Sequence, residues 1–516
     1  MDTSSNPSDA PRAGRPGEEG TLPSTLKDGR LELAAYALLI VLTMIRVGST
    51  WRVFSQTTDE PIHFLSGYEW LEEKKYTLVP DHPPLARVLA ALPLWLAGAR
   101  DGHEHDFGER INRMLMTGGR YEHNLALIRC GNLLFLLLAI IGVALWARRT
   151  LTPPFALLAT GLFASLPPII AHAGLATTDM AACATFAVAV VALHRWLNRP
   201  ILANAVLLGA AIGLGAVSKF SFLPFFGAAA IAIVVVDATA PAGRVRRAGW
   251  RGFCTLLLAS SLAAAIVLLM YRGDWHTFIY GMRMVAAHAR EGHLAYLFGR
   301  KSQHGWWYYF PVALLFKTPL PFLGLAAFGF GRRHFDAIAA AAISLAIAMS
   351  TPINIGIRHL LPIYAPLAIL AAAGAQRLWE RRPRVVVVVL CAWMFAGTLI
   401  SHPDYIPWFN ELALGHGEGI LSDSNFDWGQ DVLRLRAICR QRHIDSLAFE
   451  VFTGAPLDEI GLPPRRRIWT PMPTAGWHAI SETVLTAAGG DAAYAYVTRH
   501  PIVCRAGKTI RLYYVK

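Results

Sequence analysis

Charged residues are scarce in this chain. They make up 16% of its 516 residues, whereas a soluble domain usually carries about 25%. Hydrophobic residues make up 54% of the chain, and the mean hydropathy is +0.38. This composition excludes an ordinary soluble domain. Together with many long apolar runs, it predicts an α-helical, polytopic membrane protein.

The sequence also lacks the usual signatures of metal and nucleotide chemistry. It has 6 cysteines without metal-like spacing, and no HExxH zinc signature, Gly-rich phosphate loop or short-period repeat. Most of the cysteines lie in or beside apolar runs, where cysteine behaves as a small hydrophobe. These four are Cys130, Cys183, Cys254 and Cys391.

The first 28 residues contain no apolar run. They are rich in Ser, Pro, Gly and charge, a composition typical of disorder. No short apolar core with a small-residue cleavage site follows a basic stretch, so the pattern is not that of a cleaved signal peptide. We predict that residues 1–28 form a disordered cytoplasmic tail.

About eleven apolar runs have the length of a membrane helix, roughly 17–25 residues. They predict about 11 to 13 membrane helices within residues 29–401. The run at 85–98 is too short to cross and is predicted to lie on the bilayer surface. The predicted spans are 31–48, 124–146, 153–173, 178–197, 201–217, 221–237, 250–271, 306–330, 335–350, 357–379 and 384–401.

Arginine clusters between the spans set the orientation. Cytoplasmic loops carry an excess of Lys and Arg, and an inside N-terminus places all five clusters inside. This pattern accounts for the net charge of +13 without a nucleic-acid partner. The clusters are Arg148/Arg149, Arg195/Arg199, Arg244/Arg246/Arg247/Arg251, Arg332/Arg333 and Arg377/Arg381/Arg382/Arg384.

Two long outer segments follow from this topology. Loop 49–123 is rich in aromatic residues and His, and its length favours a functional role. Residues 402–516 predict a small α/β domain on the outer face. In that domain, "DSNFDWGQDVLRLRAICRQR" predicts an amphipathic helix, and "SLAFEVF" and "TIRLYYV" predict strands.

Cys439 and Cys504 both lie in this outer domain. Thiols in an oxidising compartment tend to pair, and a helix end can pack beside the connection that precedes the last strand. A disulfide requires Cα atoms within about 4.4–6.8 Å. Two outcomes stay open: a bridge, or two unpaired thiols with one buried on the helix.

Polar residues gather at the outer ends of several predicted spans. The first span is followed almost directly by "TTDEPIHFLSGYEWL", and further acids and cations lie at later span ends. A carboxylate can take a proton from a hydroxyl, and fixed cations can stabilise a departing phosphate. The residues are Asp59, Glu60, Asp81, His82, Asp179, Lys219, Arg358 and His359.

Each residue also has a structural explanation. An acid pair outside a helix is usually solvated, and His82 before two prolines is often a turn residue. Asp179 can cap its helix, and Lys219 can snorkel to the interface. Lys317 lies inside an apparent span, where lysine is functional by default; alternatively "WWYYF" is interfacial and the span begins later.

Several stretches resemble known membrane glycosyltransferases. They are "TTDEPIHFLSGY", "DHPPLARVL", "ATTDMAACATF", "GLGAVSKFSFLPF" and "GIRHLLPIYAPLAIL". The layout resembles the GT-C class, above all the dolichyl-phosphate-mannose–protein mannosyltransferase family (glycosyltransferase family 39) and its bacterial relatives, including lipid A aminoarabinose transferases. Two further stretches, from "GHLAYLFGRK" to "KTPLPF" and from "YIPWFNELALG" to "DSNFDWGQD", resemble bacterial phospholipid-carrier-dependent glycosyltransferases.

The resemblance implies a role for each residue. It makes Asp59 the general base and Glu60 its partner. It places Asp81 and His82 near the carrier phosphate and, in some relatives, a divalent metal ion, for which Asp81 would be a ligand. Asp179 matches a second outer-loop acid and Lys219 a basic residue after a later span. Arg358 and His359 match a polar pair near the donor head group.

The implied function is that of an inverting glycosyltransferase in a bacterial inner membrane. It would move mannose or a related hexose or pentose from a polyprenyl-phosphate carrier to an acceptor hydroxyl at the outer face. No sugar-specific signature is present, and the tail resembles no large luminal domain of the eukaryotic enzymes. The sugar and the acceptor, whether protein, lipid or glycan, therefore stay open.

Two other functions compete with this one. A flippase for lipid-linked sugars would also have many spans, but its polar residues would be spread through the bilayer midplane. A non-catalytic scaffold would explain neither the rigid "DHPPL" nor the acids at one face.

Overall fold

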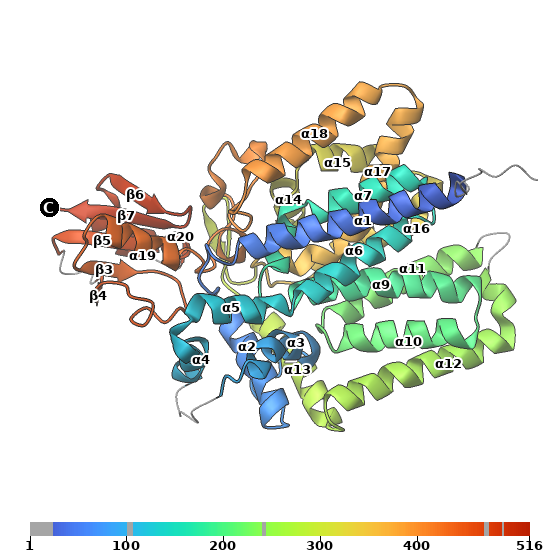
Figure 1. The fold of residues 1–516 in the computed structure, drawn as a ribbon, viewed down its shortest axis with the longest axis horizontal. Helices are drawn as coiled ribbons and strands as arrows, with labels where there is room; N and C mark the ends of the chain where they lie inside the picture. Colours follow the sequence, from blue (N-terminus) through green and yellow to red (C-terminus); the bar gives the residue numbers. More distant parts are fainter. Residues whose placement is uncertain (1–23, 101–106, 240–243, 469–473, 488–489) are drawn as a thin grey trace, which may run out of the picture.

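A computed structural model describes residues 24–100, 107–239, 244–468, 474–487 and 490–516. The predicted cytoplasmic tail lies mostly outside the described residues, and its last five positions belong to the first helix, α1 (Ser24–Ser49). Most of the described chain is helical, with a five-stranded sheet near the C-terminus. Figure 1 shows that this sheet lies at one end of a bundle of long helices.

Every apolar run predicted as a span is helical. Six helical segments of the described residues are long and apolar enough to cross a membrane, or eight if two bent pairs each count as one span. The predicted count of 11 to 13 stays a prediction. Apart from α1 and the two bent pairs, the helices that match predicted spans are α5 (Tyr121–Cys130), α6 (Leu133–Ala147), α9 (Asp179–Asn198), α10 (Leu202–Ala216), α11 (Phe222–Thr239), α12 (Arg244–Met270), α16 (Phe335–Met349), α17 (Tyr364–Glu380) and α18 (Arg384–Ile400).

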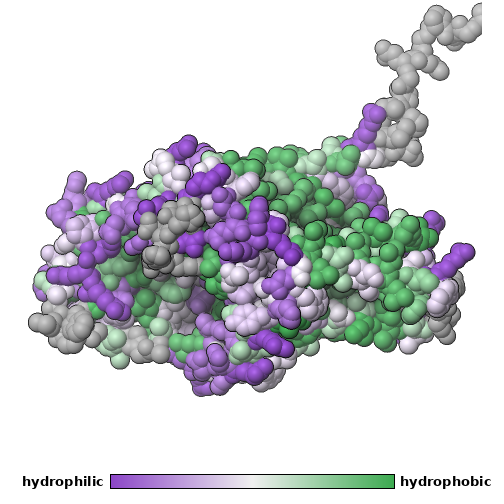
Figure 2. Space-filling view, turned by 90° about the horizontal axis from the view of Figure 1, so that it is seen from below, coloured by the Kyte–Doolittle hydropathy of each residue, from purple (hydrophilic) through white to green (hydrophobic). Residues whose placement is uncertain are grey.

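The surface agrees with this division. Hydrophobic side chains gather over the helical half in Figure 2, and hydrophilic ones gather at the end that carries the sheet. Large apolar residues such as Leu31, Leu269 and Val385 are more than 70% exposed there. So much exposed apolar surface suits hydrocarbon rather than water.

Two predicted straight spans are broken. The run 153–173 forms α7 (Pro153–Ala164) and α8 (Pro167–Ala173), bent by 61°. The run 306–330 forms α14 (Tyr309–Lys317) and α15 (Leu320–Phe328), bent by 109°. Prolines lie at the start of each second helix, Pro167 and Pro168 in α8 and Pro319 and Pro321 around the start of α15, and proline lacks the N–H that would continue the preceding helix.

The predicted outer loop 49–123 is itself folded. It forms α2 (Glu60–Glu72), α3 (Pro84–Leu96), α4 (Phe107–Leu115) and η1 (Thr117–Gly119) before α5 begins. The short helix expected at 85–98 is α3, which packs against α2. A Cβ at Gly67 of α2 would lie 1.9 Å from the Arg87 carbonyl oxygen, so this close packing requires glycine.

Shorter elements connect the long helices. The segment after α12 contains α13 (Trp275–Glu291) and the hairpin of β1 (Ala295–Leu297) and β2 (Arg300–Ser302). The short 3₁₀ turns are η2 (Arg332–His334), η3 (Ile357–Ile363), η4 (Glu411–Ala413), η5 (Gly417–Gly419) and η6 (Asp423–Asn425). Of these, η3 leads directly into α17.

The C-terminal part is the expected small α/β unit. Its strand order is β4-β3-β5-β7-β6, parallel among β4, β3 and β5 and antiparallel on both sides of β7. The elements are α19 (Val432–Gln441), β3 (Leu447–Glu450), β4 (Arg465–Arg467), β5 (Gly476–Ser481), α20 (Glu482–Thr486), α21 (Gly490–Ala493), α22 (Ala495–Thr498), β6 (Ile502–Ala506) and β7 (Ile510–Val515).

Two details of this unit differ from prediction. The helix begins at Val432, and the preceding "DSNFDWGQD" forms η6 and an irregular loop, because its side chains bond to other parts of the chain. Cys504 lies within β6 rather than in a connection. Cys439 and Cys504 share one hydrophobic cluster and both are free thiols in the structure, which is the second of the two outcomes that the sequence left open.

Candidate active site

Four of the predicted residues form one chain of ion pairs. Arg358 Nη1 donates to Asp59 Oδ2 at 2.7 Å and lies 3.9 Å from Asp179 Oδ2. Lys219 Nζ donates to the other oxygen of Asp179. Carboxylates and cations therefore alternate in the order Asp59, Arg358, Asp179, Lys219. We call this set the ion-pair chain.

Helix ends bring these residues together. Asp59 is the N-cap residue of α2, and Asp179 is the first residue of α9. Arg358 lies in η3 before α17, and Lys219 lies between α10 and α11. These helix ends lie toward the sheet, as the predicted topology requires (Figure 1).

The members of the ion-pair chain differ in exposure. The side chains of Asp179, Lys219 and Arg358 are 1%, 8% and 9% exposed, whereas that of Asp59 is 32% exposed. Asp59 is therefore the carboxylate that an incoming molecule can reach. Asp179 and Lys219 face each other inside the protein, so neither a simple helix cap nor a snorkelling lysine describes them.

Several buried polar atoms near the ion-pair chain have no hydrogen-bond partner among the described residues. Buried polar groups are almost always hydrogen-bonded, so a cluster of exceptions marks a place where water, an ion or a polar ligand would supply the missing bonds. His359 and His172 both interact electrostatically with Asp179 and Arg358. The unpartnered atoms are Asp179 Oδ2, Arg358 Nε, His359 Nε2 and His172 Nδ1.

Trp428 closes one side of this site. The Arg358 guanidinium lies 4.3 Å from the centre of the Trp428 ring, and the ring is 1% exposed. The Trp428 carbonyl accepts from Thr58 N–H at 3.1 Å. The "DSNFDWGQD" segment, predicted to begin a helix and included in the stretches that resemble phospholipid-carrier-dependent glycosyltransferases, thus forms part of the site. A tryptophan inside a run of polar turn residues was the signal for it.

Asp423 is a second residue that the sequence prediction missed. It interacts electrostatically with Arg358, Asp59 and His293, and burial raises its pKa. Its φ of +57° lies in the left-handed region, which Asp adopts more readily than most residues with a side chain.

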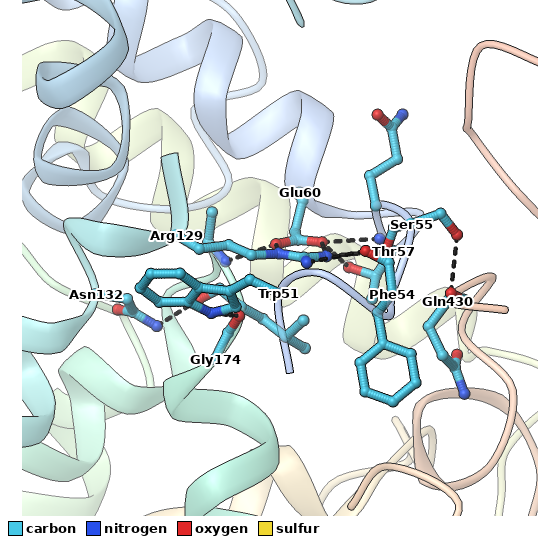
Figure 3. A network of polar contacts seen from close by, with 12 residues as sticks. Trp51, Phe54, Ser55, Thr57, Glu60, Arg129, Asn132, Gly174 and Gln430 are labelled. Atoms are coloured by element: carbon cyan, nitrogen blue, oxygen red, sulfur yellow. Dashed lines mark hydrogen bonds and ion pairs between the residues drawn. The ribbon is translucent and has the colours of Figure 1, made fainter. Parts of the chain in front are cut away.

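Glu60 is not part of the ion-pair chain. It is fully buried and pairs with Arg129 through two contacts of 2.7 and 2.8 Å. It also accepts from Thr57 N–H at 2.8 Å and from Ala176 N–H at 2.9 Å. Figure 3 shows Glu60 and Arg129 side by side within this network. With both oxygens occupied, Glu60 positions the turn that carries Asp59.

A second polar cluster surrounds the "DHPPL" stretch. Arg87, only 1% exposed, donates to Asp81 Oδ1 at 3.2 Å and to His63 Nδ1 at 3.0 Å. His82 Nδ1 lies 3.1 Å from Asp81 Oδ1. Burial lowers the pKa of His82, which keeps its ring neutral near pH 7. Because His359 interacts electrostatically with His82, this cluster adjoins the ion-pair chain.

The described residues contain no group of three or more His, Cys, Asp or Glu placed to hold a metal ion. Asp81, the residue proposed as a metal ligand, instead contacts Arg87 and His82. Burial would raise the pKa of Asp81, but the contacts with His82 and Arg87 outweigh it and lower the pKa. The surroundings of Asp81 therefore do not fit a metal ion.

Lys317 is not a member of the ion-pair chain, and its ammonium is fully occupied by backbone carbonyls. Its ammonium donates to the carbonyls of Ile406, Trp408 and Asn425 at 2.7, 2.5 and 2.7 Å. It lies at the end of α14, where the chain bends into α15. The buried lysine thus ties this bend to the segment that leads to the sheet.

The sequence matches no protein-family model and no curated protein. Among solved structures, it is similar to ArnT from Cupriavidus metallidurans in the apo state, with a TM-score of 0.49 and 14% identity over 95% of this chain and 98% of that one. The same protein bound to undecaprenyl phosphate gives a TM-score of 0.48 and 13% identity, covering 92% and 97%.

The Saccharomyces cerevisiae protein O-mannosyltransferase Pmt1–Pmt2 complex, bound to its sugar donor, gives a TM-score of 0.36 and 16% identity. That match covers 48% of this chain and 34% of the yeast chain. These TM-scores are too low to support an inference about chemistry. The proposed chemistry therefore rests on the contacts of the site itself.

Proposed function

We propose that the protein is an inverting glycosyltransferase. It moves a sugar from a polyprenyl-phosphate carrier to an acceptor hydroxyl at the outer face of a bacterial inner membrane. One observation carries the proposal: a partly exposed carboxylate, Asp59, is held by a buried cation, Arg358, in an ion-pair chain at the sheet end of apolar helices.

Asp59 acts as the general base. It takes the proton of the acceptor hydroxyl as the acceptor oxygen attacks the anomeric carbon. The bond between that carbon and the phosphate oxygen breaks, and its electron pair leaves with the carrier phosphate. One displacement on the face opposite the phosphate inverts the anomeric centre.

Arg358 and Lys219 stabilise the departing phosphate. Fixed cations in a water-poor site are effective where negative charge grows in the transition state. A phosphate that binds Arg358 competes with Asp59 for the guanidinium and so frees the Asp59 carboxylate to accept a proton. Asp179 holds both cations in place, and its unpartnered Oδ2 is available for a hydroxyl of the bound sugar.

The second cluster borders the donor. His82 is neutral and His359 Nε2 is unpartnered, so both rings can exchange hydrogen bonds with the sugar head group. Asp81 and Arg87 keep the His82 ring in place. The Glu60–Arg129 pair likewise holds the turn that carries Asp59 without contacting the substrate.

The bilayer explains the place of the site. The polyprenyl chain stays in the hydrocarbon, so its phosphate and sugar lie at the interface, beside the helix ends that carry the ion-pair chain. The arginine clusters lie at the other ends of these helices and favour a cytoplasmic location for those ends. The site would then lie on the outer face. A hydroxyl-bearing protein, lipid or glycan then arrives from outside.

The test uses the purified full chain and a panel of labelled polyprenyl-phosphate sugars, beginning with mannose and including pentoses. We expect release of polyprenyl phosphate with at least one donor, and a product whose anomeric configuration is inverted by NMR. Retention of configuration would exclude the single displacement. Passage of an intact donor across vesicles without bond cleavage would identify a transporter instead.

A further inference from the structure

A cavity of about 400 Å³ lies between the segment that connects α18 to the C-terminal α/β unit and the strands β6 and β7. This volume is within the range of about 300–1,000 Å³ that is typical of small-molecule sites. Its walls come from residues 407–418, from Phe426 and from the turn between β6 and β7. None of the residues of the ion-pair chain lines it, so it is a separate site.

Two aromatic rings form the apolar wall of the cavity. Phe409 and Phe426 have ring centroids 6.1 Å apart. The Lys317 ammonium lies 4.3 Å from the centre of the Phe409 ring, which fixes that ring. A Cβ at Gly417 would lie 2.4 Å from Phe409, so the chain passes close to the ring only as glycine. The wall is therefore rigid.

The opposite wall is charged. Arg505 Nη1 donates to Glu482 Oε1 at 2.6 Å, and Nη2 lies 3.8 Å from Glu418 Oε1. Glu418 and His416 also line the cavity. Arg505 is thus neutralised by carboxylates of the chain and does not by itself attract an anion.

Lys508 differs from Arg505. Its backbone N–H donates to Asp431 at 3.2 Å and its carbonyl accepts from Arg505 at 3.3 Å, so its backbone is fixed. The neighbouring Gly507 has φ +57°, and a Cβ there would lie 2.2 Å from the Asp431 carboxylate. Within the described residues, the Lys508 ammonium makes no hydrogen bond or ion pair. Lys508 is an exposed residue of the cavity lining, so its ammonium is free to pair with an anion bound there.

We propose that this cavity binds an acidic saccharide unit of the acceptor, a proposal that rests on the glycosyltransferase function above. The phenyl rings would form the apolar floor beneath the C–H groups of a pyranose, and Lys508 would pair with its phosphate or carboxylate. Glu418 and His416 would bond its hydroxyls. Phe426 lies between Asp423 and Trp428 in the sequence, so the cavity and the active site share one segment.

Binding of two probes tests the cavity. Glucose 6-phosphate and glucose differ only in the phosphate, and equilibrium dialysis against the full chain in detergent measures each affinity. We expect saturable binding of glucose 6-phosphate and glucose binding at least tenfold weaker, because a hydrogen bond to a charged group contributes about tenfold or more in affinity. Lys508→Gln should lower glucose 6-phosphate affinity about tenfold and leave glucose affinity unchanged.

Lys516→Gln, which removes another exposed C-terminal lysine, is the matched control and should bind both probes like the wild type. Equal affinity for the two probes, wild-type affinity of Lys508→Gln, or no saturable binding would each overturn the proposal.

Donor hydrolysis without acceptor separates the two proposals. Lys508→Gln should hydrolyse the donor at the wild-type rate, because the residue lies outside the ion-pair chain. Donor hydrolysis without saccharide binding would remove the cavity proposal alone. Saccharide binding by a protein that cleaves no donor would remove the transferase function, and with it the acceptor role of the cavity.

Discussion

Arg358 donates to Asp59 at 2.7 Å across 299 positions of the sequence. The bond joins the turn after the first apolar helix to the turn that begins α17. The same guanidinium lies against the ring of Trp428, which comes from the segment before the sheet. Three distant parts of the chain thus meet on one side chain.

Arg358→Lys should lower turnover about 10²–10³-fold, the usual cost of removing one group that stabilises transition-state charge. Lysine keeps the charge but loses the planar fork and the stacking on Trp428. Release of polyprenyl phosphate from a labelled donor measures the rate. Arg381→Lys, at an exposed position just after the end of α17, should keep the wild-type rate. Wild-type turnover by Arg358→Lys would show that the guanidinium shape has no role.

Trp428→Ala should reduce turnover about tenfold or more, because a buried cation–π contact contributes roughly 2 kcal/mol. Trp428→Phe should recover part of the loss, since phenylalanine still offers a ring to Arg358. A purely structural role would instead appear as equal losses of thermal stability and activity in both variants. Trp307→Ala is the control, because that side chain is 67% exposed.

Glu60→Ala should act on folding rather than on chemistry. It leaves Arg129 buried without its carboxylate, which typically costs 3–5 kcal/mol. We expect a large fall in the melting temperature in detergent and poor recovery from membranes. Glu122→Ala, which removes a 44% exposed partner of Arg436, should change little. A Glu60→Ala protein of unchanged stability with abolished turnover would make Glu60 a chemical participant instead.

The contribution of two buried acids, Asp427 and Asp431, to stability should fall as pH rises from about 4 to 7. Burial raises the pKa of Asp427 to about 7 and that of Asp431 to about 6, from an ordinary value of 3.8. The folded protein therefore binds more protons than the unfolded chain in this window. That contribution is fully present below the ordinary pKa and is lost as pH passes the folded pKa.

Melting temperatures between pH 4 and 8 check this dependence. Asp427→Asn removes the charge that burial opposes, so between pH 4 and 7 its melting temperature should fall less, or rise more, than that of the wild type. Asp458→Asn, at an 86% exposed position, should keep the wild-type slope. A wild-type slope in Asp427→Asn would show that this carboxylate does not titrate on unfolding.

The sequence predicted the helices and predicted that the polar residues lie at one common end of them, because the length of an apolar run and the position of an arginine cluster are local properties. It did not predict the bends before α8 and α15, because a hydropathy window treats an apolar run as continuous even where a proline interrupts it. The small C-terminal α/β unit followed from short alternating runs such as the one that became β7.

The site was only partly predictable. Asp59, Asp179, Lys219 and Arg358 lie at helix ends, so topology alone gathers them. The burial of Glu60 depends on Arg129, 69 positions away, and the role of Trp428 depends on a contact with η3. Such tertiary contacts leave no periodic pattern in one sequence.

Asp59→Asn tests the central claim most directly. The measurement is single-turnover release of polyprenyl phosphate from a labelled donor by the purified variant, with donor binding and melting temperature recorded on the same sample. Loss of a general base should lower the rate about 10²–10⁴-fold, while donor binding and the melting temperature stay close to wild type because Asp59 is partly exposed. Turnover at the wild-type rate would show that Asp59 is not the base and would contradict the proposed mechanism.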